Sequence, residues 1–260
     1  MKNQPQESPS ARVALVTGAG KRIGHAIALG LAAAGWDLAL HYRNSAAEAT
    51  ATAEAVRALG RRAVLLPCAL DDEAAVRTLV ALATDALGPV SCVVNNASQF
   101  SYDSAADFSP ALLAQQMQVN VAAPILLAQA LHAATPEGSQ AVVINLLDQK
   151  LYNMNPDFLS YTLSKAALHT ATTMLAQALA PRVRVVGVAP GLTMVSGEQS
   201  ESGFAQAHQA TPLGRSSEVR DIVEAVCYLA SARAITGTTL IVDGGQHLMP
   251  LPRDVMFLTK

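Results

Sequence analysis

The stretch that decides the fold is "TGAGKRIGHAIALG", which runs from Thr17 to Gly30. It follows the apolar run "RVALV" and leads into a helical pattern, so it predicts a strand, a tight turn and a helix in succession. Gly18 can supply the tight turn, and Gly24 the close approach of helix to strand. Such a turn places free backbone N–H groups and the positive helix end against a phosphate. We therefore predict a dinucleotide site here; the alternative is a turn with a structural role alone.

Apolar strand-like runs alternate with longer helical patterns along the rest of the chain. Continuous apolar strands separated by single helices are typical of a parallel sheet covered on both faces. With right-handed crossovers they predict an α/β fold with a doubly wound parallel sheet and helices on both faces. The expected strands are 12–18, 36–42, 63–68, 90–96, 141–147, 183–190 and 239–245, and the expected helices are 22–35, 45–59, 72–87, one beginning near Pro110, 161–180 and 217–231.

The composition indicates a compact soluble protein. Of 260 residues, 51% are hydrophobic and 15% charged, with a formal net charge of −2. This balance argues against a nucleic-acid partner, and no uninterrupted apolar run approaches the roughly 18–20 residues of a membrane helix. Cys68, Cys92 and Cys227 lie far apart without metal-ligand spacing, so we expect no metal site and buried thiols in a reducing compartment. We therefore predict a cytoplasmic protein without nucleic-acid or membrane partners.

The chain shows no internal boundary, so we expect a single domain over residues 12–260. The polar residues 1–11 predict a flexible leader. Residues 192–214 belong to the longest irregular segment, which is typical of a lid or binding loop. The tail, residues 246–260, is apolar for a terminus and suggests packing against a neighbouring subunit.

Ligands of such a sheet bind beyond the carboxyl ends of the strands. The second strand ends in "HYRNS", residues 41–45, without a carboxylate to accept a ribose 2′-OH. Its donors and its arginine suit a 2′-phosphate, which favours NADPH as the cofactor. From the strand ends, together with Tyr161 and Lys165 on the helix 161–180, we expect these cofactor-binding residues: Gly18, Lys21, Arg22, Ile23, His41, Tyr42, Arg43, Asn44, Ser45, Leu70, Asn96, Ala97, Ser98, Tyr161, Lys165, Pro190, Gly191, Leu192 and Thr193.

Tyr161 and Lys165 lie one helical turn apart and face the same way. A tyrosine hydroxyl is a poor acid or base at neutral pH unless a nearby cation lowers its pKa. Lys165 can provide that field and also bind the cofactor ribose. Asp148 lies thirteen residues before Tyr161, at a strand end. We predict a catalytic site; the alternatives are a solvated helix face for the Tyr–Lys pair and a loop cap for Asp148.

Together these motifs resemble the short-chain dehydrogenase/reductase family. The resemblance covers the chain from Arg12 to Leu248 and rests on the turn at 17–24, "NNAS" at 95–98, Asn120, Tyr161-x-x-x-Lys165, "PG" at 190–191 and "VDGG" at 242–245. It implies a Rossmann sheet of seven parallel strands and a homotetramer. It also implies that Asn120 supports a proton relay with the lysine, which adds Asn120 to the catalytic residues.

Within this family the chain resembles the pteridine reductases. Arg22 stands where a common form of the turn has glycine, Asp148 replaces the usual catalytic serine, and Phe100 follows shortly after "NNAS". The resemblance implies that Arg22 bridges the cofactor phosphates and the substrate, and that a heterocycle lies between the nicotinamide and the Phe100 ring. An ordinary core or lid position is the alternative for Phe100. The substrate-binding residues expected are Arg22, Ser98, Phe100, Asp148 and Tyr161.

These features predict NADPH-dependent reduction of a pterin C=N bond, which turns a dihydropterin, dihydromonapterin or dihydrofolate into its tetrahydro form. Tyr161 is then the proton donor, and Asp148, whose pKa we expect to be raised by a partly dry site, relays the proton to the ring nitrogen. One alternative is a carbonyl reductase of 3-oxoacyl or quinone substrates that uses the same Tyr–Lys pair. A second is a catalytically idle NADPH-binding regulatory protein.

Overall fold

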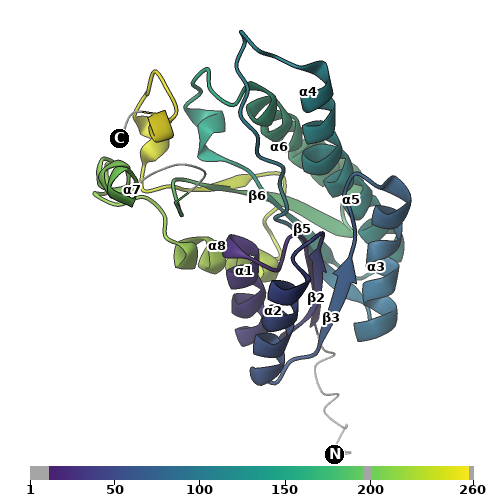
Figure 1. Ribbon diagram of the computed structural model, residues 1–260. Helices are drawn as coiled ribbons and strands as arrows, with labels where there is room; N and C mark the ends of the chain where they lie inside the picture. The colour runs from purple at the N-terminus through teal and green to yellow at the C-terminus, as the bar shows by residue number, and fades with distance from the viewer. Residues whose placement is uncertain (1–11, 196–200, 258–260) are drawn as a thin grey trace, which may run out of the picture.

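The computed structural model describes residues 12–195 and 201–257, and its centre is a sheet of seven parallel strands (Figure 1). The predicted fold class is confirmed; the predicted leader, residues 1–11, lies outside the described residues. The strand order is β3-β2-β1-β4-β5-β6-β7. The strands are β1 (Arg12–Val16), β2 (Trp36–Tyr42), β3 (Ala63–Pro67), β4 (Val90–Asn95), β5 (Ala141–Leu146), β6 (Val183–Pro190) and β7 (Thr239–Val242).

The direction of strand addition reverses between β1 and β4. Strands β2 and β3 extend the sheet on one side of β1, whereas β4 and the later strands extend it on the other. Val16, at the end of β1, pairs with Leu40 of β2 and with Val94 of β4. A crevice beyond the carboxyl ends of β1 and β4 is where a sheet of this topology binds its ligands.

Helices cover both faces of the sheet (Figure 1). Helices α1, α2 and α8 contribute side chains to the core on one face, and α3, α5 and α6 to the core on the other. Their bounds, with those of the two remaining helices, are α1 (Arg22–Ala33), α2 (Ala46–Ala58), α3 (Glu73–Leu87), α4 (Pro110–Met117), α5 (Ala123–Ala134), α6 (Leu159–Leu179), α7 (Glu201–Gln209) and α8 (Val219–Ser231).

The strand β1 shows why both faces need helices. Val13 and Leu15 point into the core with α3 and α5, whereas Ala14 and Val16 point into the core with α1 and α8. Successive strand side chains alternate between faces, so an unbroken apolar run buries apolar surface on both sides. The continuous apolar pattern "RVALV" in the sequence therefore follows from burial of β1 on both faces.

The helical run Pro110–Ala134 is long and apolar enough to cross a membrane by length and composition. Its Leu127, Ala128 and Leu131 are buried in the core beside the sheet, which accounts for that composition. A single π-helical turn, Gln118–Ala122, joins α4 to α5 within this run. Such turns are frequent at functional sites because they redirect one side chain out of the helical register.

The structure adds detail to two segments, the expected lid and the tail. The segment predicted as an irregular lid contains the helix α7, whose Ala207 is buried; residues 196–200 of the lid lie outside the described residues. The tail contacts its own chain as far as it is described, and its expected packing against a neighbouring subunit stays a prediction. Residues Leu251, Asp254, Val255 and Met256 line a cavity formed with the strand ends.

Candidate active site

The glycine turn after β1 has the geometry that its sequence predicts. Gly18 has φ of +64°, which glycine adopts without strain, and its N–H donates to Nδ1 of His41 at 3.1 Å. A Cβ on Gly24 would lie 2.2 Å from the carbonyl oxygen of Gly18, so only glycine fits there. The Asn96 amide donates to the carbonyls of Thr17 and Gly18, at 2.9 and 3.3 Å, and ties the end of β4 to the turn.

The N-terminus of α1 directly follows the glycine turn. Its N-cap residue, Lys21, makes no side-chain hydrogen bond to the helix. The first backbone N–H groups of α1 therefore lack a side-chain cap and suit an anionic ligand. Arg22 follows with φ of +53°, an uncommon conformation for a residue with a Cβ, and its Nη2 donates to the carbonyl of Val195 at 3.0 Å.

A groove of about 820 Å³ runs along this turn and the ends of β1, β2 and β4. It brings together thirteen of the residues predicted to bind the cofactor, from four separate segments of the chain. They are Gly18, Lys21, Arg22, Ile23, His41, Tyr42, Arg43, Asn44, Ser45, Leu70, Asn96, Ala97 and Ser98. No Asp or Glu is among the groove residues that the structure describes, and Arg43 is exposed at its edge. The groove thus fits a phosphorylated dinucleotide.

His41 has a different role from the one predicted. Its side chain is buried, and both ring nitrogens form hydrogen bonds with the backbone. Nδ1 bonds to the Gly18 N–H, and Nε2 bonds to the Cys68 carbonyl at 3.0 Å. Burial lowers the pKa of His41, so the ring is neutral, with Nε2 as donor and Nδ1 as acceptor. His41 supports the glycine turn from behind and offers no free donor to a 2′-phosphate.

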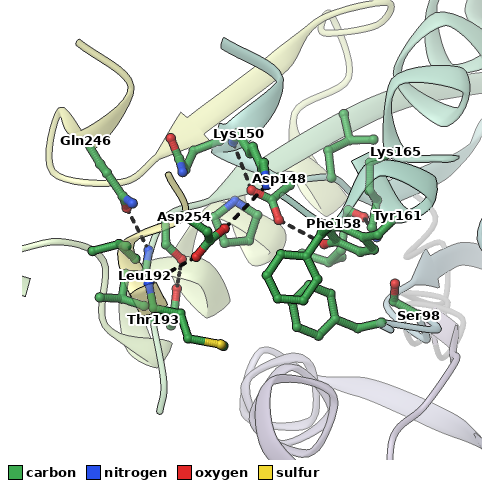
Figure 2. A pocket seen from close by; sticks show the side chains of 18 of the residues that line it. Ser98, Asp148, Lys150, Phe158, Tyr161, Lys165, Leu192, Thr193, Gln246 and Asp254 are labelled. Atoms are coloured by element: carbon green, nitrogen blue, oxygen red, sulfur yellow. Dashed lines mark hydrogen bonds and ion pairs between the residues drawn. The ribbon is translucent and has the colours of Figure 1, made fainter. Parts of the chain in front are cut away.

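A second cavity, of about 350 Å³, adjoins the groove. Arg22, Ile23, Asn96, Ser98 and Phe100 line both spaces, so the two form one continuous site. The remaining residues predicted for the site, except Asn120, line this second cavity: Asp148, Tyr161, Lys165, Pro190, Gly191, Leu192 and Thr193. Figure 2 shows Asp148 and Tyr161 facing one another inside it.

Asp148 and Tyr161 form a buried hydrogen-bonded pair. The Tyr161 hydroxyl donates to Oδ2 of Asp148 at 2.8 Å, and the backbone N–H of Lys150 donates to Oδ1 at 2.9 Å. Burial raises the pKa of the Asp148 carboxyl, against the effect of these hydrogen bonds, as expected from the sequence. Asp148 is therefore both a cap of the short 3₁₀ turn Gln149–Tyr152 and a hydrogen-bond acceptor of the Tyr161 hydroxyl.

The expectation of a lowered pKa for Tyr161 does not hold in this structure. Burial raises the pKa of Tyr161 well above its ordinary value, and the Asp148 charge adds to the effect. The Lys165 ammonium instead donates to the Leu146 carbonyl at 2.8 Å, and burial lowers its own pKa to about 8. Because Tyr161 and Lys165 are both buried, the alternative of a solvated helix face is excluded.

Asn120 supports the site from behind. It sits in the π-helical turn, where its Oδ1 accepts from the Gln99 N–H at 2.8 Å and from the Ser98 hydroxyl at 3.2 Å. Its Nδ2 donates to the Gln99 carbonyl at 3.0 Å and to the Ser164 hydroxyl at 2.9 Å. These bonds fix the "NNAS" loop against α6 rather than reach Lys165. Asn120 thus positions the loop after β4, and its implied support of a proton relay with Lys165 stays a prediction.

Phe100 belongs to an aromatic cluster at the mouth of the cavity. Its ring stacks on Phe158 with centroids 4.4 Å apart and meets Tyr161 edge-on at 4.7 Å. Phe100 is 44% exposed, which excludes an ordinary core position. Phe158 was not predicted as a site residue; it has φ of +54° at the start of α6, and such strain concentrates at functional sites. No sequence pattern distinguishes it from a core phenylalanine.

Lys150 and Asp254 also line the cavity without having been predicted. The Lys150 ammonium is buried, 5.3 Å from the Phe158 ring centroid and 3.4 Å from Oδ2 of Asp254. Asp254 comes from the tail, 106 residues after Asp148, so only the fold brings them together. Within the described part of the chain, no group of three or more His, Cys, Asp or Glu side chains is placed to hold a metal ion.

Comparisons with known proteins agree with this architecture. A family model described as enoyl-(acyl carrier protein) reductase matches residues 18–247. The crystal structure of FolM alternative dihydrofolate reductase 1 from Brucella canis, complexed with NADP, has a TM-score of 0.89 and 39% identity over 94% of this chain and 97% of that chain. Pteridine reductase 1 from Leishmania tarentolae is 30% identical over 93% of this chain and 98% of that protein.

A further relative acts on a different class of molecule. Galactitol 2-dehydrogenase (L-tagatose-forming) from Cereibacter sphaeroides is 36% identical over 89% of this chain and 93% of that protein. The proteins similar to this chain thus include enzymes named for different classes of substrate. With a family match over most of its length, the chain belongs to the short-chain dehydrogenase/reductase family.

Proposed function

We propose that the protein is an NADPH-dependent reductase of pterins, which converts a dihydropterin, dihydromonapterin or dihydrofolate into its tetrahydro form. The observation that carries the proposal is the buried Asp148–Tyr161 pair in a cavity that also holds the exposed ring of Phe100. The NADP-bound FolM structure and the pteridine reductase relative support both the cofactor and the substrate class.

The groove residues fit a dinucleotide phosphate. The uncapped N-terminus of α1 and the Gly18–Gly24 turn would hold the pyrophosphate, and Arg43 with Asn44 and Ser45 the 2′-phosphate. Lys165 lines the second cavity together with Tyr161 and would hold the ribose hydroxyls. NADPH, when bound, supplies the two electrons and one hydrogen that the C=N bond needs.

The chain's own residues supply the proton. Reduction of a C=N bond ends with a proton on the ring nitrogen, so the site needs an acid near that atom. Tyr161 passes its hydroxyl proton to Asp148 across their hydrogen bond, and the neutral carboxyl delivers a proton to the ring nitrogen. Burial raises the pKa of this carboxyl, so it keeps its proton to higher pH than an ordinary aspartic acid, while it remains a much stronger acid than a serine hydroxyl. Phe100 and Phe158 give the flat ring an apolar wall and keep water out.

A panel of substrates tests the proposal. NADPH oxidation is measured with dihydrobiopterin, dihydromonapterin and dihydrofolate, and in parallel with 3-oxoacyl, quinone and ketose substrates. We expect turnover with at least one pterin and markedly weaker turnover with the carbonyls. A thermal-shift arm with NADPH plus methotrexate tests binding: stabilisation beyond that from NADPH alone is expected. The absence of turnover with every pterin would overturn the proposal.

The second candidate function is carbonyl reduction with the same Tyr161–Lys165 pair. It is favoured by the galactitol dehydrogenase relative and by the description of the family model. The same panel separates the two, since this candidate expects turnover with carbonyls alone. Cofactor binding without turnover of any acceptor would instead indicate an idle NADPH-binding protein.

A further inference from the structure

The end of the chain forms one wall of the substrate cavity. We call residues 251–257 the C-terminal wall; its Leu251, Asp254, Val255 and Met256 line the cavity together with Phe100 and Arg22. The wall belongs to the same chain as the rest of the described site. Figure 2 shows the Asp254 side chain directed into the cavity beside Asp148, which lies between it and Tyr161 in this view.

An ion pair holds the wall in place. Arg253 contacts Asp157 through Nε at 2.8 Å and Nη2 at 2.8 Å, and the backbone N–H of Asp254 donates to the same carboxylate at 2.7 Å. Phe257 packs on Phe158, with centroids 6.1 Å apart, and edge-on against Tyr102 at 5.5 Å. The wall is thus fastened to the residues that begin α6, the helix that carries Tyr161 and Lys165.

Lys150 connects the wall to the proton-transfer pair. Its ammonium lies 3.4 Å from Oδ2 of Asp254, and its backbone N–H donates to Oδ1 of Asp148 at 2.9 Å. The ammonium also donates to the carbonyl of Asp157 at 2.5 Å, so its position is fixed from the wall's anchor as well. One buried lysine therefore sets the positions of two carboxylates, one on the 3₁₀ turn and one on the wall.

We propose that Asp254 is a positioning residue for proton transfer: its carboxylate, held in the cavity by Lys150 and by the Arg253–Asp157 pair, favours the protonated form of Asp148 over the ionised form. The inference deepens the proposed function and rests on it for the role of Asp148. Asp254 need not touch the substrate for this effect, because charge acts through a desolvated cavity over several ångströms.

The charged groups around Asp148 determine the sign of the effect. Tyr161 and Lys165 face it from α6, Lys150 from the 3₁₀ turn, Asp254 from the wall, and Arg22 lines the cavity from α1. Burial raises the pKa of Asp148 most, Lys165 lowers it, and Asp254 raises it. Neutralising Asp254 removes this contribution and leaves the Lys150 ammonium without its carboxylate partner. Both changes favour ionised Asp148.

The direct test is the titration of Asp148 in the full-length protein. The carboxyl ¹³C resonance, assigned by its loss in Asp148→Asn, is followed against pH in wild type, Asp254→Asn and Asp254→Glu. We expect the midpoint to move to lower pH in Asp254→Asn and to return toward the wild-type value in Asp254→Glu. Glu224→Gln, which removes an exposed carboxylate on α8, is the matched control and should leave the midpoint unchanged. An unchanged midpoint in Asp254→Asn overturns the inference.

Kinetics provide the second measurement. With a dihydropterin that wild type reduces, Asp254→Asn should move the alkaline limb of the kcat profile to lower pH. A purely structural role would instead lower kcat by one factor at every pH and leave the limb in place, which also contradicts the inference. If wild type reduces no pterin, the proposed function fails, whereas the carbon titration still decides the role of Asp254.

Discussion

At the scale of single residues, the tyrosine hydroxyl carries the largest expected effect. Tyr161→Phe removes the proton donor but keeps the ring that contacts Phe100. We expect a loss of roughly 10²–10⁴-fold in kcat for pterin reduction, the usual contribution of a general acid, with NADPH affinity nearly unchanged. Tyr152→Phe is the matched control, because that hydroxyl bonds to His169 outside the cavity. Comparable activity of Tyr161→Phe and wild type would remove Tyr161 from the mechanism.

Lys165 gives a prediction about stability and pH. Its pKa is about 8 in the folded chain because of burial, below its ordinary value of 10.5. Between these values the unfolded chain binds more protons than the folded chain, so wild-type stability rises with pH through this window. Relative to Lys165→Met, which does not titrate, wild type should gain about 2 kcal/mol from pH 7 to pH 9.5. Urea unfolding of both proteins at the two pH values measures the difference. A constant difference contradicts the assigned pKa direction.

At the scale of elements, the contact between the first turn and α1 is the tightest constraint on the site. Gly24→Ala would place a Cβ 2.2 Å from the Gly18 carbonyl oxygen, and a backbone atom cannot move aside as a side chain can. We expect a loss of about 3 kcal/mol in the free energy of unfolding, typical of severe overpacking, together with weakened NADPH binding. Denaturant unfolding and cofactor titration measure the two effects.

Gly60→Ala is the control for this substitution. Gly60 has φ of +75°, but a Cβ added there would meet no described atom within 4 Å, so the cost is conformational only, about 1 kcal/mol. NADPH binding should be unaffected. Equal costs for the two substitutions would show that the close approach at Gly24 is not what constrains the turn.

The elements also show what the sequence can and cannot predict. Strands were predictable because each buries both faces and reads as an apolar run, and residues at strand ends could be assigned to the site because parallel strands end at one edge. The helix α7 was missed since its few apolar residues lie among polar ones. The role of His41 depends on the backbone carbonyl of Cys68, in the loop that follows β3, and such a partner leaves no local signal. Asp254 and Phe158 enter the site through tertiary packing alone.

At the scale of the whole molecule, the assembly stays a prediction. The homotetramer implied by family resemblance needs apolar surface that one chain leaves uncovered. Leu163 and Met174 on α6 are 45% and 64% exposed, large values for apolar side chains on one helix. If α6 lies at a subunit interface, Met174→Glu should lower the molar mass measured by analytical ultracentrifugation, whereas Leu59→Glu, at an exposed position after α2, should not. A monomeric wild type would contradict the assembly directly.

The proposed function depends most on the Asp148 carboxyl. This group stands at the position where a serine hydroxyl would suffice for carbonyl reduction. Replacing Asp148 by Ser therefore tests the account most directly. Single-turnover rates with NADPH are measured for a dihydropterin and for a carbonyl substrate, with NADPH affinity as the check on folding. The account predicts that Asp148→Ser loses pterin reduction by roughly 10²-fold or more while NADPH affinity is retained. Undiminished pterin reduction by Asp148→Ser would contradict it.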